Sequence, residues 1–173
     1  LCEEIIAHGK NIPVVYTSSI QASENNAYGR SKRNAEKSVF DLHDKTGSPV
    51  YVFRLPNIFG KWCKPNYNSA VATFCFNIAR SIPVTVRDPQ AEFTLIYVED
   101  LIDRLIKIID GVGVSPNLAG FESVEPSTTS TVGEVVGMIA KFHKDRKEVS
   151  VGSVGAGFVR KLYSTYISYL PST

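Results

Sequence analysis

The sequence predicts an α/β fold built on a parallel sheet, and three observations lead to that prediction. Two apolar runs, at 12–16 and 50–55, have the length and β-branched content of buried strands. Between them, residues 26–45 form a helical pattern with an apolar stripe at Ala35, Val39 and Leu42. The connections are short, which favours a right-handed crossover between parallel strands.

The remaining elements follow from periodicity and capping residues. A first amphipathic helix ends at Gly9, and Gly47 ends the helix that starts near residue 26. Later in the chain, Thr131-x-x-Glu134 has the spacing of a capping box at a helix start. The predicted later helices cover 69–80, 99–110, 131–142 and 158–169, and the predicted short strands cover 82–86, 93–98 and 117–121.

Composition narrows the possible function. With 173 residues and a formal net charge of +2, the chain has the size of a domain and no basic excess for nucleic acid. No apolar run reaches the length of a membrane span. The three cysteines lack metal-ligand spacing, which predicts reduced thiols in a cytoplasmic protein and no metal site. Because the chain begins at Leu1 inside a helical pattern, we expect a fragment of a longer protein.

Hydroxyl and basic residues gather around the first predicted strand. Thr17, Ser18 and Ser19 follow its apolar run, at the edge of a parallel sheet where ligands bind. Tyr28 and Lys32 begin the next helix and lie four residues apart, so they share one helix face. This arrangement predicts a site for proton transfer.

The residue types suit that chemistry. A tyrosine hydroxyl, with an ordinary pKa of about 10, is a poor base at neutral pH. A neighbouring ammonium favours the phenolate, and general acid–base catalysis improves as the pKa approaches the working pH. Ser19 would hold the substrate oxygen while Tyr28 transfers the proton. A Tyr and a Lys four residues apart also occur by chance, so the pair gains meaning only from the strand and hydroxyl cluster before it.

The loop at 61–68, KWCKPNYN, has two open interpretations. It is either an ordinary surface loop with Trp62 and Tyr67 packed down, or a wall for a ring-bearing, anionic ligand such as a nucleotide diphosphate.

Several stretches of the sequence resemble a known family. VVYTSS, YGRSK and FRLPNIFG occur in this order in extended short-chain dehydrogenases/reductases, the NAD-dependent epimerase/dehydratase family. TSSIQA, NNAYGRSK, TFCFNIAR, LYSTYISYLP and above all RLPNIFGKWCKPNYNS are similar to its capsular-polysaccharide synthesis enzymes. The resemblance covers essentially the whole chain.

The resemblance implies a division of the chain. Residues 1–60 would form the C-terminal half of a Rossmann-type dinucleotide-binding sheet with the Tyr/Lys helix. Residues 61–173 would form mainly the small substrate-binding subdomain, with some segments returning to the sheet. The Gly-rich turn of the family, G-x-x-G-x-x-G, has no counterpart in this sequence, nor does the C-terminal cupin domain of the capsular enzymes.

The resemblance also implies an activity. It is the NADPH-dependent reduction of a UDP-linked 4-keto-6-deoxy-N-acetylhexosamine, for L-fucosamine-type surface polysaccharide, with NAD as the alternative cofactor. Ser19, Tyr28 and Lys32 would be catalytic, with Tyr28 protonating the C4 oxygen and Lys32 also binding the nicotinamide ribose. The other implied cofactor contacts are Thr17, Ser18, Leu55 and Pro56, and either Thr17 or Ser18 would replace Ser19 if the strand ended earlier. The implied substrate contacts are Asn57, Lys64, Asn68 and Arg80.

Other functions stay open at this point. A non-catalytic nucleotide-sugar-binding or oligomerising module is compatible with the missing Gly-rich turn, and a nucleotide-sugar 4-epimerase or dehydratase would differ in substrate and not in site. The expected partners are a UDP-sugar and a second copy of the chain, because the strand at 12–16 would expose an apolar edge.

Overall fold

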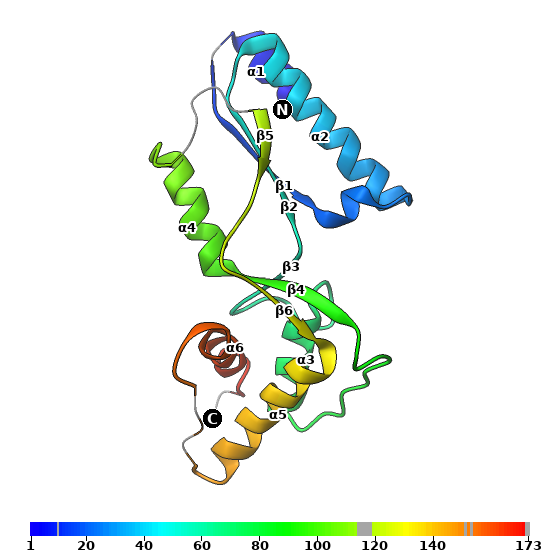
Figure 1. Ribbon diagram of the computed structural model, residues 1–173, viewed down its shortest axis with the longest axis vertical. Helices are drawn as coiled ribbons and strands as arrows, with labels where there is room; N and C mark the ends of the chain where they lie inside the picture. The colour runs from blue at the N-terminus through cyan, green and yellow to red at the C-terminus, as the bar shows by residue number, and fades with distance from the viewer. Residues whose placement is uncertain (10, 114–118, 151, 153, 172–173) are drawn as a thin grey trace. The chain divides into compact units, whose positions relative to one another are not determined.

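The computed structural model describes residues 1–9, 11–113, 119–150, 152 and 154–171, which fold into two compact units (Figure 1). The first unit comprises Leu1–Pro56 and Ile102–Glu125, and the second comprises Asn57–Leu101 and Pro126–Thr173. The first boundary therefore follows Pro56, and the segment Ile102–Glu125 returns to the first unit. The binding roles expected for the two parts stay a prediction.

The first unit contains a parallel sheet, which confirms the α/β class. Its elements are α1 (Cys2–His8), β1 (Val14–Ser19), the short 3-10 helix η1 (Ile20–Ser23), α2 (Ala27–Thr46), β2 (Val50–Leu55), β5 (Ala119–Glu122) and the second part of α4 (Val98–Ile109). The strand order is β1-β2-β5, with every pair parallel. In the first pair, Ser18 lies opposite Arg54 and Ser19 opposite Leu55, so β1 and β2 end together.

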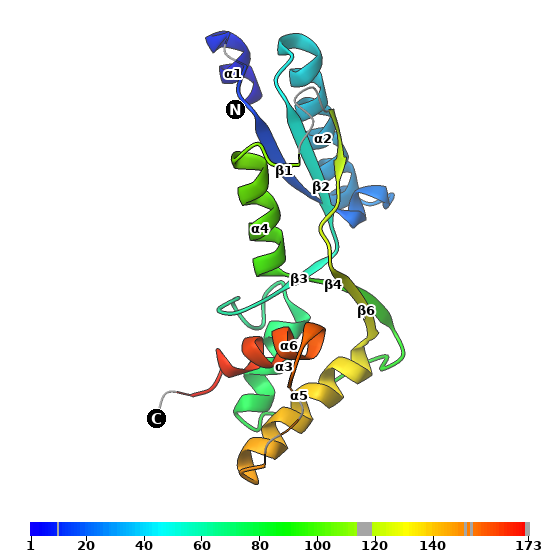
Figure 2. The same cartoon turned by 60° about the vertical axis from the view of Figure 1, so that its left-hand side comes forward.

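The apolar faces of α1, α2, β1 and β2 form one core. It contains Ile5, Val14, Val39, Leu42, Val50 and Val52. Helix α2 lies along the sheet in both views (Figure 2). The Asn26 side chain caps its N-terminus by accepting from the Gly29 amide at 2.7 Å, and Gly47 ends it at φ 70°. These caps set where α2 begins and where it ends.

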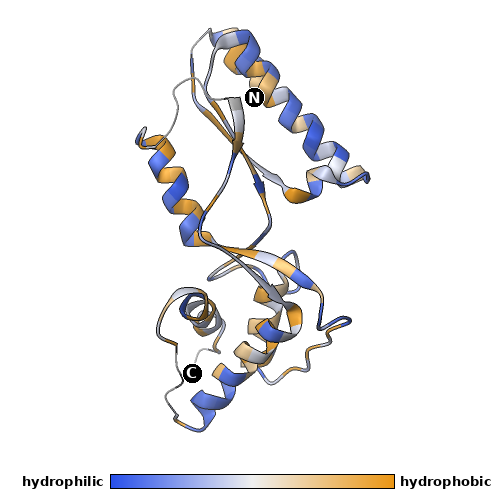
Figure 3. Ribbon diagram, in the orientation of Figure 1, coloured by the Kyte–Doolittle hydropathy of each residue, from blue (hydrophilic) through white to orange (hydrophobic). Residues whose placement is uncertain are grey.

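The second unit packs three helices against a mixed sheet. Its elements are β3 (Asn57–Phe59), α3 (Ala70–Ala79), β4 (Glu92–Tyr97), the start of α4, β6 (Ser127–Thr131), α5 (Val132–Lys147) and α6 (Gly157–Ile167). Strand β4 pairs parallel with β3 and antiparallel with β6. The core includes Val71, Cys75, Val135, Ile139, Leu162 and Tyr166. The basic end of α5 is hydrophilic, as expected for a solvated helix terminus (Figure 3).

Several predicted strand positions were wrong. The first strand is not 12–16 but Val14–Ser19, because Pro13 has no amide to donate and the hydroxyl residues pair with β2 instead. Residues 82–86 form no strand; Pro83 lacks a donor, and the Ile82 amide bonds the Asn77 carbonyl in the turn after α3. Strands β3 and β6 were not predicted. Of the strand predicted at 117–121, residues 117 and 118 lie outside the described residues.

No helix in the described part of the chain is long and apolar enough to cross a membrane.

Candidate functional site

The hydroxyl residues Thr17, Ser18 and Ser19 form the end of strand β1, at the carboxyl edge of the parallel sheet. Ser19 is its last residue, and its Oγ accepts from the Gln21 amide at 3.2 Å, which caps η1. This bond uses an acceptor position of the hydroxyl, and within the described residues its O–H has no hydrogen-bond partner. Ser19 can therefore still donate to a ligand oxygen.

A close packing of η1 on α2 sets where Tyr28 lies relative to the strand end. A Cβ at Gly29 would clash with the carbonyl oxygens of Gln21 and Glu24, so only glycine allows this approach. Arg33 adds to the contact, donating from Nη1 to the carbonyls of Ala22 and Glu24, the latter at 2.9 Å. The glycine after Tyr28 is thus required by packing.

Tyr28 and Lys32 lie together as the four-residue spacing predicts. The Lys32 Nζ atom lies 5.7 Å from the centre of the Tyr28 ring and 5.5 Å from that of Tyr16 on β1. It also donates to the Thr17 carbonyl at 3.4 Å. Tyr28 is 51% exposed. Lys32 therefore contacts both Tyr28 and the end of β1, and the Tyr28 phenol is accessible to solvent.

Ser18 occupies a different environment from Ser19. It is buried, and its hydroxyl donates to Glu36 Oε1 at 2.5 Å. Arg54 on β2 donates to the same carboxylate, from Nε to Oε1 at 3.0 Å and from Nη2 to Oε2 at 2.7 Å. The Ser18 hydroxyl proton is therefore used in the hydrogen bond to Glu36. The cofactor contact expected of Ser18 stays a prediction.

Sequence reasoning missed Glu36 and Arg54. Glu36 is 3% exposed, and burial alone would raise its pKa; hydrogen bonds from Arg54 and Ser18 outweigh that, so the pKa lies below its usual value. Two signals were available: Glu36 follows Lys32 by four residues, and Arg54 interrupts an apolar strand.

The other predicted cofactor contacts lie around the same strand ends. Thr17 is exposed, Leu55 is buried as the last residue of β2, and Pro56 follows it half-buried. Their roles stay predictions.

In the second unit, the structure brings two of the predicted substrate contacts together. Asn57 and Asn68 line one cavity of about 30 Å³, together with Ile58, Ser69, Ala70, Val71 and Phe93. Asn57 also donates to the Thr94 carbonyl at 3.4 Å. This volume suits a water molecule or one small polar group.

Lys64 and Arg80 do not line that cavity. The Lys64 Nζ atom lies 5.5 Å from the Tyr67 ring centre. Arg80 stacks on Phe76 at 3.8 Å and donates to the Tyr169 carbonyl at 2.8 Å, so it ties α3 to the residues after α6. Their substrate contacts stay predictions, and Arg80 has a structural role that the sequence did not indicate.

The loop at 61–68 does not pack its aromatic residues down. Trp62 is 82% exposed and Tyr67 73% exposed. The loop is nevertheless anchored: the Tyr169 hydroxyl donates to the Cys63 carbonyl at 2.6 Å, and the Asn66 amide donates to Thr73 Oγ1 at 2.9 Å. This excludes the interpretation with packed aromatic rings.

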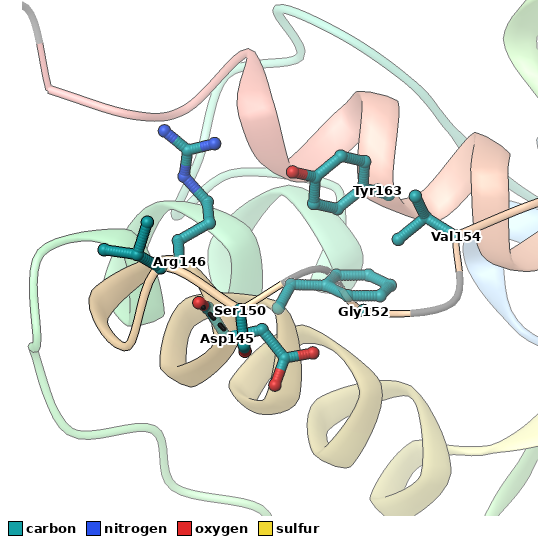
Figure 4. A pocket seen from close by; sticks show the side chains of 8 residues that line it. Asp145, Arg146, Ser150, Gly152, Val154 and Tyr163 are labelled. Atoms are coloured by element: carbon teal, nitrogen blue, oxygen red, sulfur yellow. Dashed lines mark hydrogen bonds between the residues drawn. The ribbon is translucent and has the colours of Figure 1, made fainter.

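A larger cavity of about 380 Å³ lies between α5 and α6 (Figure 4). Its lining residues are Phe142, Asp145, Arg146, Val149, Ser150, Gly152, Val154 and Tyr163. None of these is among the site residues predicted from the sequence.

Comparison with known proteins shows the family of the chain. Residues 2–117 match the NAD dependent epimerase/dehydratase family. The chain belongs to this family. Within it, the chain is 48% identical over 171 residues to the UDP-2-acetamido-2,6-beta-L-arabino-hexul-4-ose reductase of Pseudomonas aeruginosa, covering 99% of this chain and 45% of that protein.

Solved structures of the epimerase/dehydratase family agree with the fold. The capsular polysaccharide assembling protein CapF of Staphylococcus aureus superposes with a TM-score of 0.87 at 37% identity, over 98% of this chain and 48% of that one. The UDP-glucuronic acid 4-epimerase of Bacillus cereus, solved with UDP-glucuronic acid and NAD, gives a TM-score of 0.75 at 11% identity and shows the shared fold alone. The chain spans about half the length of the Pseudomonas aeruginosa reductase and of the CapF structure.

Proposed function

We propose that this chain carries the proton-transfer half of a nucleotide-sugar reductase. The reaction is the NADPH-dependent reduction of a UDP-linked 4-keto-6-deoxy-N-acetylhexosamine, for L-fucosamine-type residues of surface polysaccharide. The observation that carries the proposal is the position of the Lys32 ammonium, which lies 5.7 Å from the Tyr28 ring centre and bonds the Thr17 carbonyl, two residues before Ser19 at the carboxyl end of β1. The 48% identity to a reductase of such a sugar supports the substrate class.

The donors at this edge fit the nicotinamide end of a dinucleotide. Among the described residues, the Lys32 ammonium makes one long hydrogen bond, to the Thr17 carbonyl, so it retains donors for ribose hydroxyls. Pro56, which is half-buried and follows the buried Leu55, offers an apolar surface at the adjacent strand end. NADPH, when bound, supplies the hydride that reduces the C4 carbonyl carbon.

Side chains of this chain carry out the proton transfer that accompanies the hydride transfer. Ser19 donates a hydrogen bond to the C4 oxygen and polarises the carbonyl. Tyr28 gives its hydroxyl proton to that oxygen as the carbon is reduced, so the ketone becomes an alcohol. Lys32 stabilises the phenolate that remains, and solvent restores the proton at the exposed ring. Asn57, Lys64, Asn68 and Arg80 are the proposed contacts to the nucleotide part.

The test is a Tyr28→Phe substitution in the whole protein, assayed for NADPH oxidation with the 4-keto sugar. We expect kcat to fall about 10²- to 10⁴-fold, while UDP-sugar binding measured by calorimetry is retained. Wild-type protein that binds UDP-sugar but does not turn over, with binding insensitive to Tyr28→Phe, would instead identify a non-catalytic nucleotide-sugar-binding module. Turnover of a UDP-hexose without net NADPH oxidation would identify a 4-epimerase.

A further inference from the structure

One buried carboxylate links the two elements that carry the proposed catalytic residues. Glu36 of α2 accepts hydrogen bonds from Ser18 of β1 and from Arg54 of β2. Ser18 and Arg54 lie directly opposite each other in the parallel pair. The three residues, here called the Glu36 network, therefore join a helix to two neighbouring strands at one point.

Each member of the Glu36 network is adjacent to a proposed site residue. Ser18 immediately precedes Ser19, and Arg54 immediately precedes Leu55. Glu36 lies one helical turn beyond Lys32 on the same face of α2. A shift of the carboxylate would therefore move the strand ends relative to the helix pair.

Burial of Glu36 and an aromatic contact of Arg54 restrain the Glu36 network. Glu36 is almost fully buried, so its charge must be paired and hydrogen-bonded. The Arg54 guanidinium carbon lies 4.2 Å from the centre of the Phe121 ring on β5, so the ring adds a cation–π contact to the network. A buried ion pair often adds no more stability than a well-packed apolar pair, so stability alone gives little reason for it here.

We propose that the Glu36 network is a positioning device, which sets the spacing between Ser19 on β1 and the Tyr28–Lys32 pair on α2. The proposal rests on the proposed reductase function. Glu36 and Arg54 are not among the proposed substrate or cofactor contacts, and the Ser18 hydroxyl is engaged with Glu36, so the network acts through its neighbours. Loss of the network should therefore lower kcat and leave KM nearly unchanged, since the proposed contacts to the nucleotide part of the substrate lie on residues outside the network and its neighbours.

The experiment separates positioning from stability by comparing two variants of the whole protein. Glu36→Gln breaks the ion pair and should lower kcat about 10- to 100-fold. The double variant Glu36→Met/Arg54→Met replaces the pair by apolar side chains and should recover thermal stability. We expect its kcat to stay low, because methionines cannot hold the two strands to the helix. Arg54→Lys, which keeps the charge and loses the fork, should give an intermediate kcat.

A matched control comes from the same unit. Arg104 and Glu122 form a comparably buried ion pair between α4 and β5, away from the proposed site residues in sequence. Glu122→Gln should lower stability with kcat unchanged within about twofold. A kcat that returns with stability in the double variant, or that falls equally in Glu122→Gln, would overturn the proposal.

Hydrogen–deuterium exchange gives a readout that does not depend on turnover. In Glu36→Gln, amides of 19–23 and 28–32 should exchange faster than in wild type, and those of β6 and α5 should not change. Unchanged exchange at 19–23 and 28–32 would contradict the positioning role. If the wild-type protein shows no reductase activity, the proposed function fails, and this exchange comparison still decides whether the network orders the two segments.

Discussion

Lys32 and Tyr28 are neighbours across one turn of α2, with the ammonium nitrogen 5.7 Å from the centre of the phenol ring. The hydrogen bond from the same nitrogen to the Thr17 carbonyl holds it toward β1. Lys32 therefore contacts both Tyr28 on the helix and the Thr17 carbonyl near the end of β1. Its removal should disturb both the proton donor and the cofactor contact.

Lys32→Met should therefore affect two measurements at once. We expect kcat for the 4-keto sugar to fall about 100-fold, within the usual range for loss of acid–base assistance, and NADPH binding to weaken. Stopped-flow turnover and a fluorescence titration with NADPH measure the two effects. Lys37→Met is the matched control, because Lys37 is an exposed lysine of the same helix. Full activity in Lys32→Met would refute the assigned role.

Acid should destabilise the first unit through Glu36. Burial opposes the ionised form, but the hydrogen bonds from Arg54 and Ser18 and the Arg54 charge prevail, so the folded pKa lies below the ordinary 4.5. Because the folded pKa is the lower one, the contribution is fully present above the unfolded pKa. It is lost as pH falls through the folded pKa.

Urea unfolding at a series of pH values tests this linkage. At neutral pH, Glu36→Gln should lower the free energy of unfolding by about 3 kcal/mol, the low end for a broken buried ion pair, because Arg54 is partly exposed. The gap between wild type and variant should narrow below about pH 4.5. A gap that stays constant down to about pH 3 would show that folding does not lower the pKa of Glu36.

Local sequence patterns predicted the helices well because their ends are fixed by nearby residues. Helix α5 runs past its predicted end at residue 142 to Lys147, but the Thr131–Glu134 capping box and the Gly9 cap of α1 form as the sequence indicated. Each involves contacts within three residues, so no knowledge of the tertiary structure was needed.

Contacts distant in sequence were not predictable in the same way. Strand β6 is Ser/Thr-rich, with no apolar run, and exists because it pairs with β4. Glu36 was overlooked because a helix stripe was counted by apolar residues alone, whereas its burial depends on Arg54, eighteen residues away. The predicted site residues on β1 and α2 came out near each other because one short crossover connects them.

Trp62 offers a direct test of the exposed loop, since it is the only tryptophan of the chain. If the loop forms a wall for a nucleotide, UDP should change the Trp62 emission and a free N-acetylhexosamine should not. Trp62→Ala should weaken UDP-sugar binding about 5- to 100-fold, the range for loss of one base–aromatic stack. An emission spectrum insensitive to saturating UDP would exclude this role.

Within the described residues, only one edge of β1 is paired, which predicts self-association of the 173-residue chain. Strand β1 is at the end of the β1-β2-β5 order, and Val15 on it is 37% exposed. Unpaired strand edges template pairing with another chain, and an added charge opposes it. Size-exclusion chromatography with light scattering should show dimers or larger species, reduced by Val15→Lys and not by Ile109→Lys on α4. A compact wild-type monomer would contradict the prediction.

The three cysteines should differ sharply in reactivity. Cys75 is fully buried on α3, and desolvation raises the pKa of its thiol to about 12, so the reactive thiolate is strongly disfavoured. Cys2 and Cys63 are partly exposed. Iodoacetamide at about pH 8 should therefore modify Cys2 and Cys63 in the folded protein and reach Cys75 only after denaturation, as mass spectrometry of the digested chain would show. Rapid labelling of Cys75 in the native protein would mean that the core between α3, α5 and α6 opens readily.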